Sequence, residues 1–257
     1  MFEAVMIAAT GLKNQQQRID TIADNVANVN TDGFKASRLD FKDALYTAGI
    51  VPAAPRTPDG NQQKGHGLMI ATITKDFSTG NLNATGNLLD FSIVGEGLFE
   101  LENLNGETIY TRGGNFYVQP SDGVLYLVNS SGYFVHDANG ARITVPDGTD
   151  SLAVSETGEI EFVGDGITET SRFGLYTFRN IRGLVSVGSG NYAESNSSGE
   201  KLRADKAQIV QGYKEGSNVD LAAEMTRLIR AQRAFSLAGR ALTTADDMEG
   251  IANNLRR

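Results

Sequence analysis

Apolar residues recur with helical heptad spacing at both ends of this chain, and the long sequence between them lacks that pattern. The first stripe spans roughly 28 residues, which as a helix would be about 42 Å long. Gln15 interrupts it once, and Gly33 follows as a residue suited to the left-handed conformation at a helix end. The stripe consists of Val5, Ala8, Leu12, Ile19, Ile22, Val26 and Val29. This region therefore predicts one long helix with a narrow apolar face.

A second stripe of the same kind lies near the C-terminus. Ser217 is predicted as the N-cap of its helix, with Asp220 three positions later, and Gln232 interrupts the stripe. The stripe consists of Leu221, Met225, Leu228, Phe235, Gly239 and Leu242, after which it shifts register to Ala245, Met248, Ala252 and Leu255. Two helices with narrow apolar faces can bury them against each other, so we predict a coiled coil of the two ends. Alternatively, each helix packs separately on the middle of the chain.

The middle of the chain is predicted to be β-rich. Short β-branched and aromatic runs alternate with turn-forming pairs such as Asn105-Gly106 and Asn139-Gly140, and the latter predicts a type I′ turn. Glycine accounts for 29 of 257 residues, about 11%, compared with an average of about 7% in proteins. The pattern predicts a meander of antiparallel hairpins and an α+β fold overall. The predicted domains are a terminal helical domain, a linker and a β-rich domain, which comprise residues 1–35 with 217–257, 36–70, and 71–216.

The composition excludes several kinds of chemistry. Without cysteine the chain can form no disulfide and no thiolate metal site, and its two histidines, His66 and His136, stand in unrelated contexts. We therefore expect no metal and no cofactor. The formal net charge of -8 argues against nucleic acid as a partner. The first 50 residues and the last 44 are nearly neutral, which favours association of the ends with each other or with other copies.

The N-terminus does not match a cleaved signal peptide. It has Glu3 near its start, no positively charged segment, and too short an apolar run. No run approaches the roughly 18 apolar residues of a membrane span. These features predict a protein that is cytoplasmic, or that leaves the cell by a route in which nothing is cleaved from its N-terminus.

Two carboxylate pairs raise the possibility of a hydrolase. Glu100 with Glu102, and Glu159 with Glu161, would each lie on one strand face about 7 Å apart, which glycosidases can use. A solvated strand face has the same appearance, and the chain has no tryptophan on which a sugar could stack. We therefore predict that the protein is not an enzyme and has no small-molecule substrate. A generic surface fibre is a further alternative.

Three groups of motifs resemble a known family. The N-terminal group is residues 23–35, within which the family positions are Asn25, Asn28, Thr31, Gly33, Phe34 and Lys35. The C-terminal group is Gln211-Gly212-Tyr213, Glu215 to Val219, Glu224-Met225 and Ala231 to Phe235. The middle group is Gly80 to Leu82, Asp90 to Phe99 and Tyr110 to Phe116. Together these motifs resemble the rod and hook proteins of the bacterial flagellum, over nearly the whole chain and in the family's order.

The resemblance implies a mechanical function. In this family the terminal helices form a coiled coil that lines the inner tube of the axial structure, and the β-rich domain stands outside it. The chain would then be a self-assembling subunit of the basal-body rod, the drive shaft that transmits torque to the hook. Its length is most similar to distal rod members, and a proximal rod subunit or a hook-like axial protein is the alternative. Export by the flagellar type III apparatus, without cleavage, would place it in the cell envelope.

The resemblance also implies partners and roles for particular residues. The partners would be further copies of the chain, other rod and hook proteins, and the export apparatus. Asn28, Thr31, Gly33 and Phe34 would fix the turn from the helix into the outer domain. The stripe residues would hold the inner helical pair together, and those assigned to this role are Val5, Leu12, Ile19, Ile22, Val26, Leu221, Met225, Leu228, Phe235 and Leu242.

Overall fold

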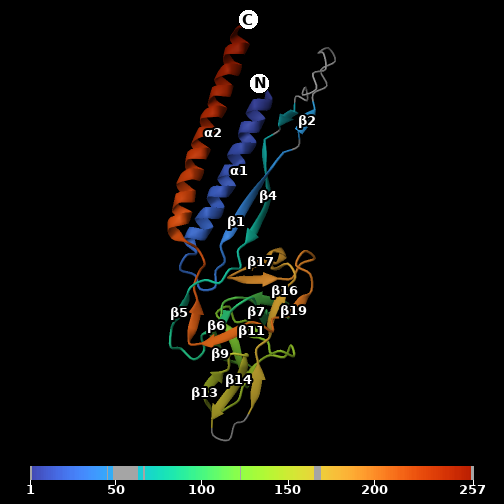
Figure 1. Ribbon diagram of the computed structural model, residues 1–257, viewed down its shortest axis with the longest axis vertical. Helices are drawn as coiled ribbons and strands as arrows, with labels where there is room; N and C mark the ends of the chain where they lie inside the picture. The colour runs from blue at the N-terminus through green and yellow to red at the C-terminus, as the bar shows by residue number, and fades with distance from the viewer. Residues whose placement is uncertain are drawn as a thin grey trace. The chain divides into compact units, whose positions relative to one another are not determined.

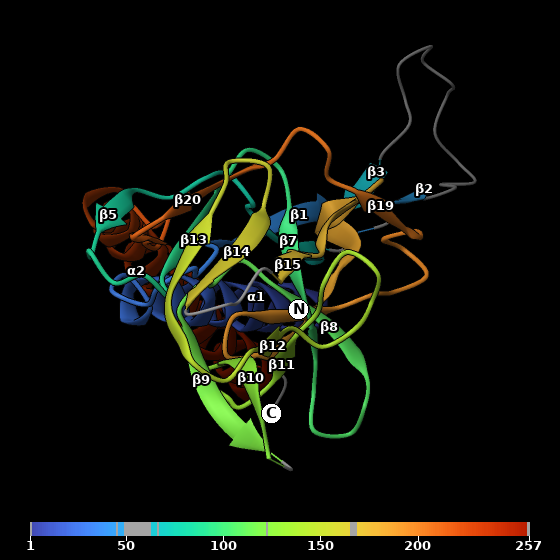
Figure 2. The same ribbon diagram turned by 90° about the horizontal axis from the view of Figure 1, so that it is seen from below.

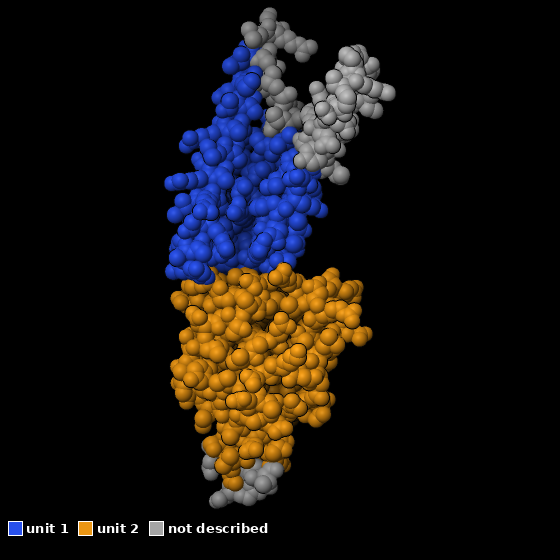
Figure 3. Space-filling model, viewed as in Figure 1, with its two compact units in different colours: residues 1–27, 37–74, 220–257 blue, residues 28–36, 75–219 orange. Residues whose placement is uncertain are grey.

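The computed structural model describes residues 2–44, 46–48, 63–65, 67–121, 123–164 and 169–255 (Figure 1). It confirms an α+β fold with a helix at each end and a β-rich middle. The chain forms two compact units (Figure 3). Unit 1 comprises Met1–Ala27, Ser37–Thr74 and Asp220–Arg257, and unit 2 comprises Asn28–Ala36 and Lys75–Val219. Each unit therefore contains segments that are far apart in the sequence.

Unit 1 consists of two helices and two short antiparallel strand pairs. Its elements are α1 (Phe2–Ala27), β1 (Ser37–Asp43), β2 (Tyr46–Ala48), β3 (Gln63–Gly65), β4 (Leu68–Lys75) and α2 (Leu221–Leu255). Helix α1 packs against both α2 and β1, and β1 pairs with β4 (Figure 1). Strand β1 and the start of β4 lie in the segment 36–70, for which the sequence predicted a linker. None of the described helices is apolar over a long enough stretch to cross a lipid bilayer.

Helix α1 has two semi-buried stripes rather than one. The predicted stripe is buried at Ile22 and half-buried at its other described positions. A second stripe, with Asn14, Arg18 and Asn25, lies beside the β1–β4 ribbon: the Asn14 amide donates to the Leu68 carbonyl. A helix face with polar side chains can be buried in this way, because the backbone groups of the strands form hydrogen bonds with those side chains.

Helix α2 begins later than predicted. Asp220, and not Ser217, is the N-cap, because its Oδ1 accepts hydrogen bonds from the amides of Ala222 at 2.9 Å and Ala223 at 3.1 Å. The Ser217 hydroxyl instead accepts from the amide of Val219 at 3.3 Å, in a turn that precedes the helix. Aspartate at this position also places a negative charge at the positive end of the helix dipole.

Unit 2 is built from antiparallel strands. Its strands are β5 (Leu82–Ala84), β6 (Phe91–Val94), β7 (Leu98–Glu102), β8 (Thr108–Thr111), β9 (Phe116–Ser121), β10 (Val124–Asn129), β11 (Phe134–Val135), β12 (Thr144–Val145), β13 (Thr149–Val154), β14 (Glu159–Gly164), β15 (Thr170–Arg172), β16 (Leu175–Phe178), β17 (Val185–Gly188), β18 (Asn191–Ala193), β19 (Lys201–Arg203), β20 (Gln208–Gln211) and β21 (Tyr213–Glu215), with a 3₁₀ turn at Ile181–Gly183. The main sheet runs β12-β10-β11-β7-β8-β18-β17, with β9, β16 and β19 attached to it. Figure 2 shows the β9–β10 hairpin projecting at one edge.

The predicted hairpins are present, but the connectivity is more than a meander. Strands β7–β8, β9–β10, β13–β14 and β17–β18 pair as sequential hairpins. The last two strands return to the first two, since β20 pairs with β6 and β21 pairs with β5. The segment Lys75–Val219 of unit 2 thus has paired strands near its two ends, a long-range contact that local sequence patterns do not encode.

The turn at Asn139-Gly140 is not of type I′. That type needs a positive φ at both central residues, whereas only Gly140 has one here, at 83°. The turn is held instead by Asp137, whose Oδ1 accepts from the amides of Asn139 and Ala141, each at 2.8 Å. Because the Asp137 carboxylate is occupied by backbone donors, a three-residue loop with glycine at its left-handed position is stable.

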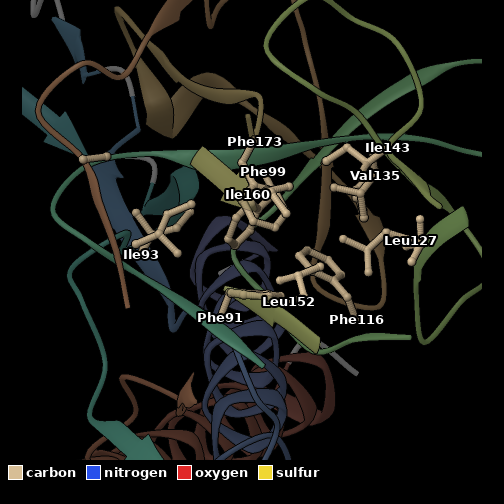
Figure 4. Close-up of a cluster of buried hydrophobic side chains, with 14 of the residues drawn as sticks. Phe91, Ile93, Phe99, Phe116, Leu127, Val135, Ile143, Leu152, Ile160 and Phe173 are labelled. Atoms are coloured by element: carbon tan, nitrogen blue, oxygen red, sulfur yellow. The ribbon is translucent and has the colours of Figure 1, made fainter. Parts of the chain in front are cut away.

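An aromatic cluster forms the centre of unit 2 (Figure 4). The rings of Phe99 and Phe116 lie 5.2 Å apart, and those of Phe91 and Phe173 lie 5.1 Å apart. Each side chain is almost fully buried, which contributes about 1.5–3 kcal/mol per ring to stability. Gly114 lets the connection between β8 and β9 approach β6 closely, because a Cβ at this position would lie 1.8 Å from the Phe91 carbonyl oxygen.

Candidate functional site

The N-terminal and C-terminal family motifs meet inside unit 2 through an ion pair. Lys35 and Glu215 are separated by 180 residues, and the Lys35 Nζ lies 2.6 Å from Glu215 Oε1. The other carboxylate oxygen, Oε2, lies 2.6 Å from Nε of Arg112, at the end of β8. All three side chains are at most 3% exposed. We call Lys35, Arg112 and Glu215 the Glu215 cluster.

Backbone groups complete the hydrogen bonds of the Glu215 cluster. Lys35 Nζ donates to the Ser78 carbonyl at 2.7 Å, and the Gly80 amide donates to Glu215 Oε1 at 2.8 Å. The Arg112 guanidinium also donates to the carbonyls of Ile93, Gly95 and Gly97, at distances of 2.6–2.8 Å. Burial lowers the pKa of the Lys35 ammonium, and the Glu215 charge opposes that shift. The cluster is therefore a buried network in which each charged group is paired and also bonded to backbone, which fixes its side chains rigidly.

Gly33 brings the N-terminal segment close to Glu215. Its amide donates to the Glu215 carbonyl at 2.7 Å, and its φ is 69°, in the left-handed region. A Cβ here would lie 2.9 Å from the Gly113 amide nitrogen. Glycine is required at this position for two reasons. Its backbone is in the left-handed conformation, and the Gly113 backbone lies too close to leave room for a side chain.

Two asparagines, one in each unit, hydrogen-bond to backbone groups within their own unit. In unit 1, Asn25 at the end of α1 pairs with Ser37: its Nδ2 donates to the carbonyl at 2.9 Å and its Oδ1 accepts from the amide at 2.8 Å. In unit 2, Asn218 Oδ1 accepts from the Ala36 amide at 2.8 Å, and its Nδ2 donates to the Asp76 carbonyl at 2.7 Å. The Asn218 carboxamide thus bonds the backbone of Ala36, and the Asn25 carboxamide bonds the backbone of the next residue, Ser37.

The remaining motif residues form a series of turns. The Thr31 hydroxyl donates to the Asn28 side chain at 3.2 Å, and the amide of Phe34 donates to the Thr31 carbonyl at 3.2 Å. The Phe34 ring is half-buried beneath Lys75, whose Nζ lies 4.5 Å from the ring centroid. These contacts give residues 28–34 a defined path within unit 2.

The stripe residues differ in their burial. On α1, Val5, Leu12, Ile19 and Val26 are half-buried and Ile22 is 5% exposed. On α2, Leu228, Phe235 and Leu242 are half-buried in the same way.

The start of the α2 stripe has a different register. Leu221 and Met225 are 44% and 43% exposed, and Gln232 is also exposed. Glu224 and Ala231 are buried at the neighbouring positions instead. The semi-buried positions of α2 then follow heptad spacing through 224, 228, 231, 235, 238, 242 and 245. The large apolar residues at the start of α2 are thus left at the surface.

The carboxylates that suggested a hydrolase are in salt bridges or exposed. Glu100 is buried against Lys201, whose Nζ lies 2.5 Å from Oε1. Glu102 binds Arg142 at 2.7 Å and His136 at 3.0 Å, and chiefly the Arg142 hydrogen bond lowers its pKa to about 2. Glu159 and Glu161 are exposed along β14. His66 lies outside the described residues.

Three family descriptions match the chain in sequence order: flagella basal body rod protein over residues 6–35, flagellar hook protein FlgE/F/G D1 domain over 92–162, and flagellar basal body rod FlgEFG protein C-terminal over 210–255. The flagellar basal-body rod protein FlgG of Bacillus subtilis (strain 168) is 37% identical, and that of Borreliella burgdorferi 36%, each over the full length of both chains. The chain belongs to the flagellar basal-body rod protein family. The FlgG protein of Agrobacterium fabrum is 33% identical over 97% of this chain and 98% of its own.

The Glu215 cluster takes one residue from each of the three matched regions of this rod protein. Lys35 lies in the first, Arg112 in the second and Glu215 in the third. Membership of this family means that the chain is a structural protein and not an enzyme. The sequence motifs contained all three residues, but their contact was not predicted, because nothing local in the sequence shows that a lysine and a glutamate 180 residues apart are paired.

Proposed function

We propose that this protein is a structural subunit of the flagellar basal-body rod, in its distal segment. The observation that carries the proposal is full-length similarity to FlgG rod proteins together with a cluster that joins all three matched regions. Copies would assemble into the axial drive shaft that transmits torque to the hook. Heterologous contacts between copies would build this helical shaft, because such contacts propagate without end when the rotation between neighbours does not close a ring.

We infer that α1 and α2 act as a coiled coil in the rod. Both helices have semi-buried positions at heptad spacing, including Ile22 on α1 and Phe235 on α2, and they pack along each other in unit 1. In this proposal residues 1–35 and 217–257 form the inner helical domain, 36–70 connects it, and 71–216 form the outer domain. The assigned stripe residues would hold the inner layer of the rod together.

We infer that the Glu215 cluster carries load between the terminal segments and the β-rich domain. A subunit that transmits torque must not slip where its chain enters and leaves a domain. Lys35 lies just before the chain first leaves unit 2, Glu215 lies shortly before the chain leaves it for the last time, and Arg112 ties both residues to the sheet. Removing one partner of a buried charge pair costs about 3–5 kcal/mol, so the junction resists local opening.

The proposed partners are other rod and hook proteins, together with the flagellar type III export apparatus. Export without cleavage would deliver the subunit to the cell envelope. A proximal rod subunit is the alternative position in the same structure.

The test is to isolate hook-basal bodies from the bacterium that encodes this chain and to search them for its peptides by mass spectrometry. The proposal predicts that the chain is present in intact particles and that deleting its gene abolishes hooks. Motile cells with complete hooks after the deletion would contradict it. The Gly33→Val variant should fail to restore motility, because a β-branched residue cannot take the left-handed turn.

A further inference from the structure

A polar cavity in unit 1 has not been given a role by the assembly proposal. It has a volume of about 260 Å³ and lies between α1, β1 and the first turns of α2. Arg18 and Ile22 contribute from α1, Arg38 and Asp40 from β1, and Glu224 from α2. This volume is large enough for a polar side chain from another molecule.

Glu224 is the unusual residue in this cavity. It is 3% exposed, and its Oε1 accepts from the Arg227 guanidinium at 2.5 Å. Its Oε2 is buried and has no hydrogen-bond partner among the described residues. A buried carboxylate oxygen without a donor destabilises the folded chain, so its presence calls for a donor that the isolated chain does not provide.

The arginines of the cavity are not equivalent. Arg227 is paired with Glu224, and Arg38 is paired with Asp40 at 3.0 Å. Arg18 has its guanidinium 5.8 Å from the centroid of the Phe41 ring and is not within salt-bridge distance of any described carboxylate. The cavity therefore offers one acceptor without a donor and one guanidinium without an anion.

A second buried acceptor lies on α1, the helix that carries Arg18. Gln15 is one turn before Arg18 on α1, and its Oε1 is likewise buried with no partner among the described residues. Two orphan acceptors on facing helices indicate that this region is completed by hydrogen-bond donors from outside the chain.

We propose that the cavity binds the carboxamide side chain of a glutamine or asparagine from an adjacent copy of this chain. The carboxamide NH₂ would donate to Glu224 Oε2, and its oxygen would accept from Arg18. A cationic side chain would be repelled by three guanidinium groups, and an anionic one by the buried Glu224 carboxylate, whereas a neutral donor–acceptor group complements both. The chain exposes such groups on its helices, at Gln17 on α1 and Gln232 on α2. The inference rests on the proposed function, in which copies pack helix against helix.

The test compares Glu224→Gln with Glu200→Gln, which changes an exposed glutamate in the same way. Each full-length variant replaces the native chain in the bacterium, and its amount in purified hook-basal bodies is measured by quantitative mass spectrometry. The melting temperature of each isolated chain is measured in parallel. We expect Glu224→Gln to reduce incorporation at least tenfold with its melting temperature unchanged or raised, and Glu200→Gln to leave both unchanged. The Glu224→Asp variant, which keeps the charge but retracts it, should also incorporate poorly.

Three results would overturn the inference. Normal incorporation of Glu224→Gln would mean that water satisfies the oxygen, and the proposed function would stand. A fall in melting temperature of more than about 5 °C would show that Glu224 serves the isolated chain. Absence of the unchanged chain from the particles would contradict both the inference and the proposed function.

Discussion

The carboxylate of Glu215 accepts the Lys35 ammonium at 2.6 Å although the two residues are 180 positions apart and both side chains are buried. This contact joins the segment that follows α1 to the segment that precedes α2. The sheet contributes Arg112 to the same carboxylate, also at 2.6 Å. The first segment of the chain in unit 2, residues 28–36, and the end of its second segment, residues 75–219, are thereby fixed to one structure.

Replacement of Glu215 by glutamine should strongly destabilise unit 2. Lys35 and Arg112 would lose their shared anion in a buried site, and we expect a loss of about 3–5 kcal/mol in the free energy of unfolding. Urea unfolding followed by near-ultraviolet circular dichroism measures it. The exposed Glu159→Gln variant is the control and should change stability by less than about 0.5 kcal/mol. Equal stability of the two variants would contradict the structural role of the cluster.

Two glycine variants separate backbone strain from steric contact. Gly132 has φ 77° and open space around it, so Gly132→Ala should cost only the left-handed penalty of about 1–2 kcal/mol. Gly33→Ala adds a contact of 2.9 Å with the Gly113 backbone and should cost more. Thermal unfolding of both variants tests the difference, and a Gly33 variant no less stable than the Gly132 variant would show that the Gly113 backbone, between β8 and β9, can move away.

The Glu102–Arg142 ion pair should make stability depend on pH in the acid range. Arg142 lowers the folded-state pKa of Glu102 from 4.5 to about 2, so the unfolded chain takes up the proton first as the pH falls. The contribution is complete above the unfolded pKa and is lost as the pH falls through the folded pKa. The stability difference between the unchanged chain and Glu102→Gln should therefore shrink between about pH 5 and pH 2. A difference that stays constant over this interval would rule out the coupling.

Asn25→Ala should loosen the end of α1 from β1. The substitution removes the two hydrogen bonds between the Asn25 carboxamide and the Ser37 backbone, for a loss of about 2 kcal/mol. Far-ultraviolet circular dichroism during thermal unfolding measures this effect. Asn30→Ala, at an exposed site outside α1, is the matched control. If both variants melt together, the Asn25 carboxamide does not hold this junction.

Sequence periodicity predicted the helices because heptad spacing is a local property. Ile22 and Phe235 could be assigned to narrow apolar faces without knowing their partners. The second stripe of α1 escaped prediction, because Asn14 and Asn25 are polar and their burial depends on strand backbone that is distant in sequence. From sequence alone, polar residues on a helix predict a face exposed to solvent, unless their hydrogen-bond partners are known.

The start of α2 shows a different limit. Ser217 and Asp220 both suit an N-cap, and only the path of the preceding chain decides between them. Leu221 and Met225 were assigned to the apolar stripe by their size, whereas the structure buries Glu224 there and exposes both of them. A hydrophobic pattern cannot predict a charged residue at a buried position. That residue, Glu224, also has a carboxylate oxygen without a hydrogen-bond partner among the described residues.

The most direct test of the central claim is to label this protein in purified hook-basal bodies with an antibody against its β-rich domain and to locate the label by electron microscopy. The account predicts label along the distal rod, immediately next to the hook. Label confined to the proximal rod would reassign the subunit within the same structure. Intact particles without any label would contradict the claim that this chain is part of the rod.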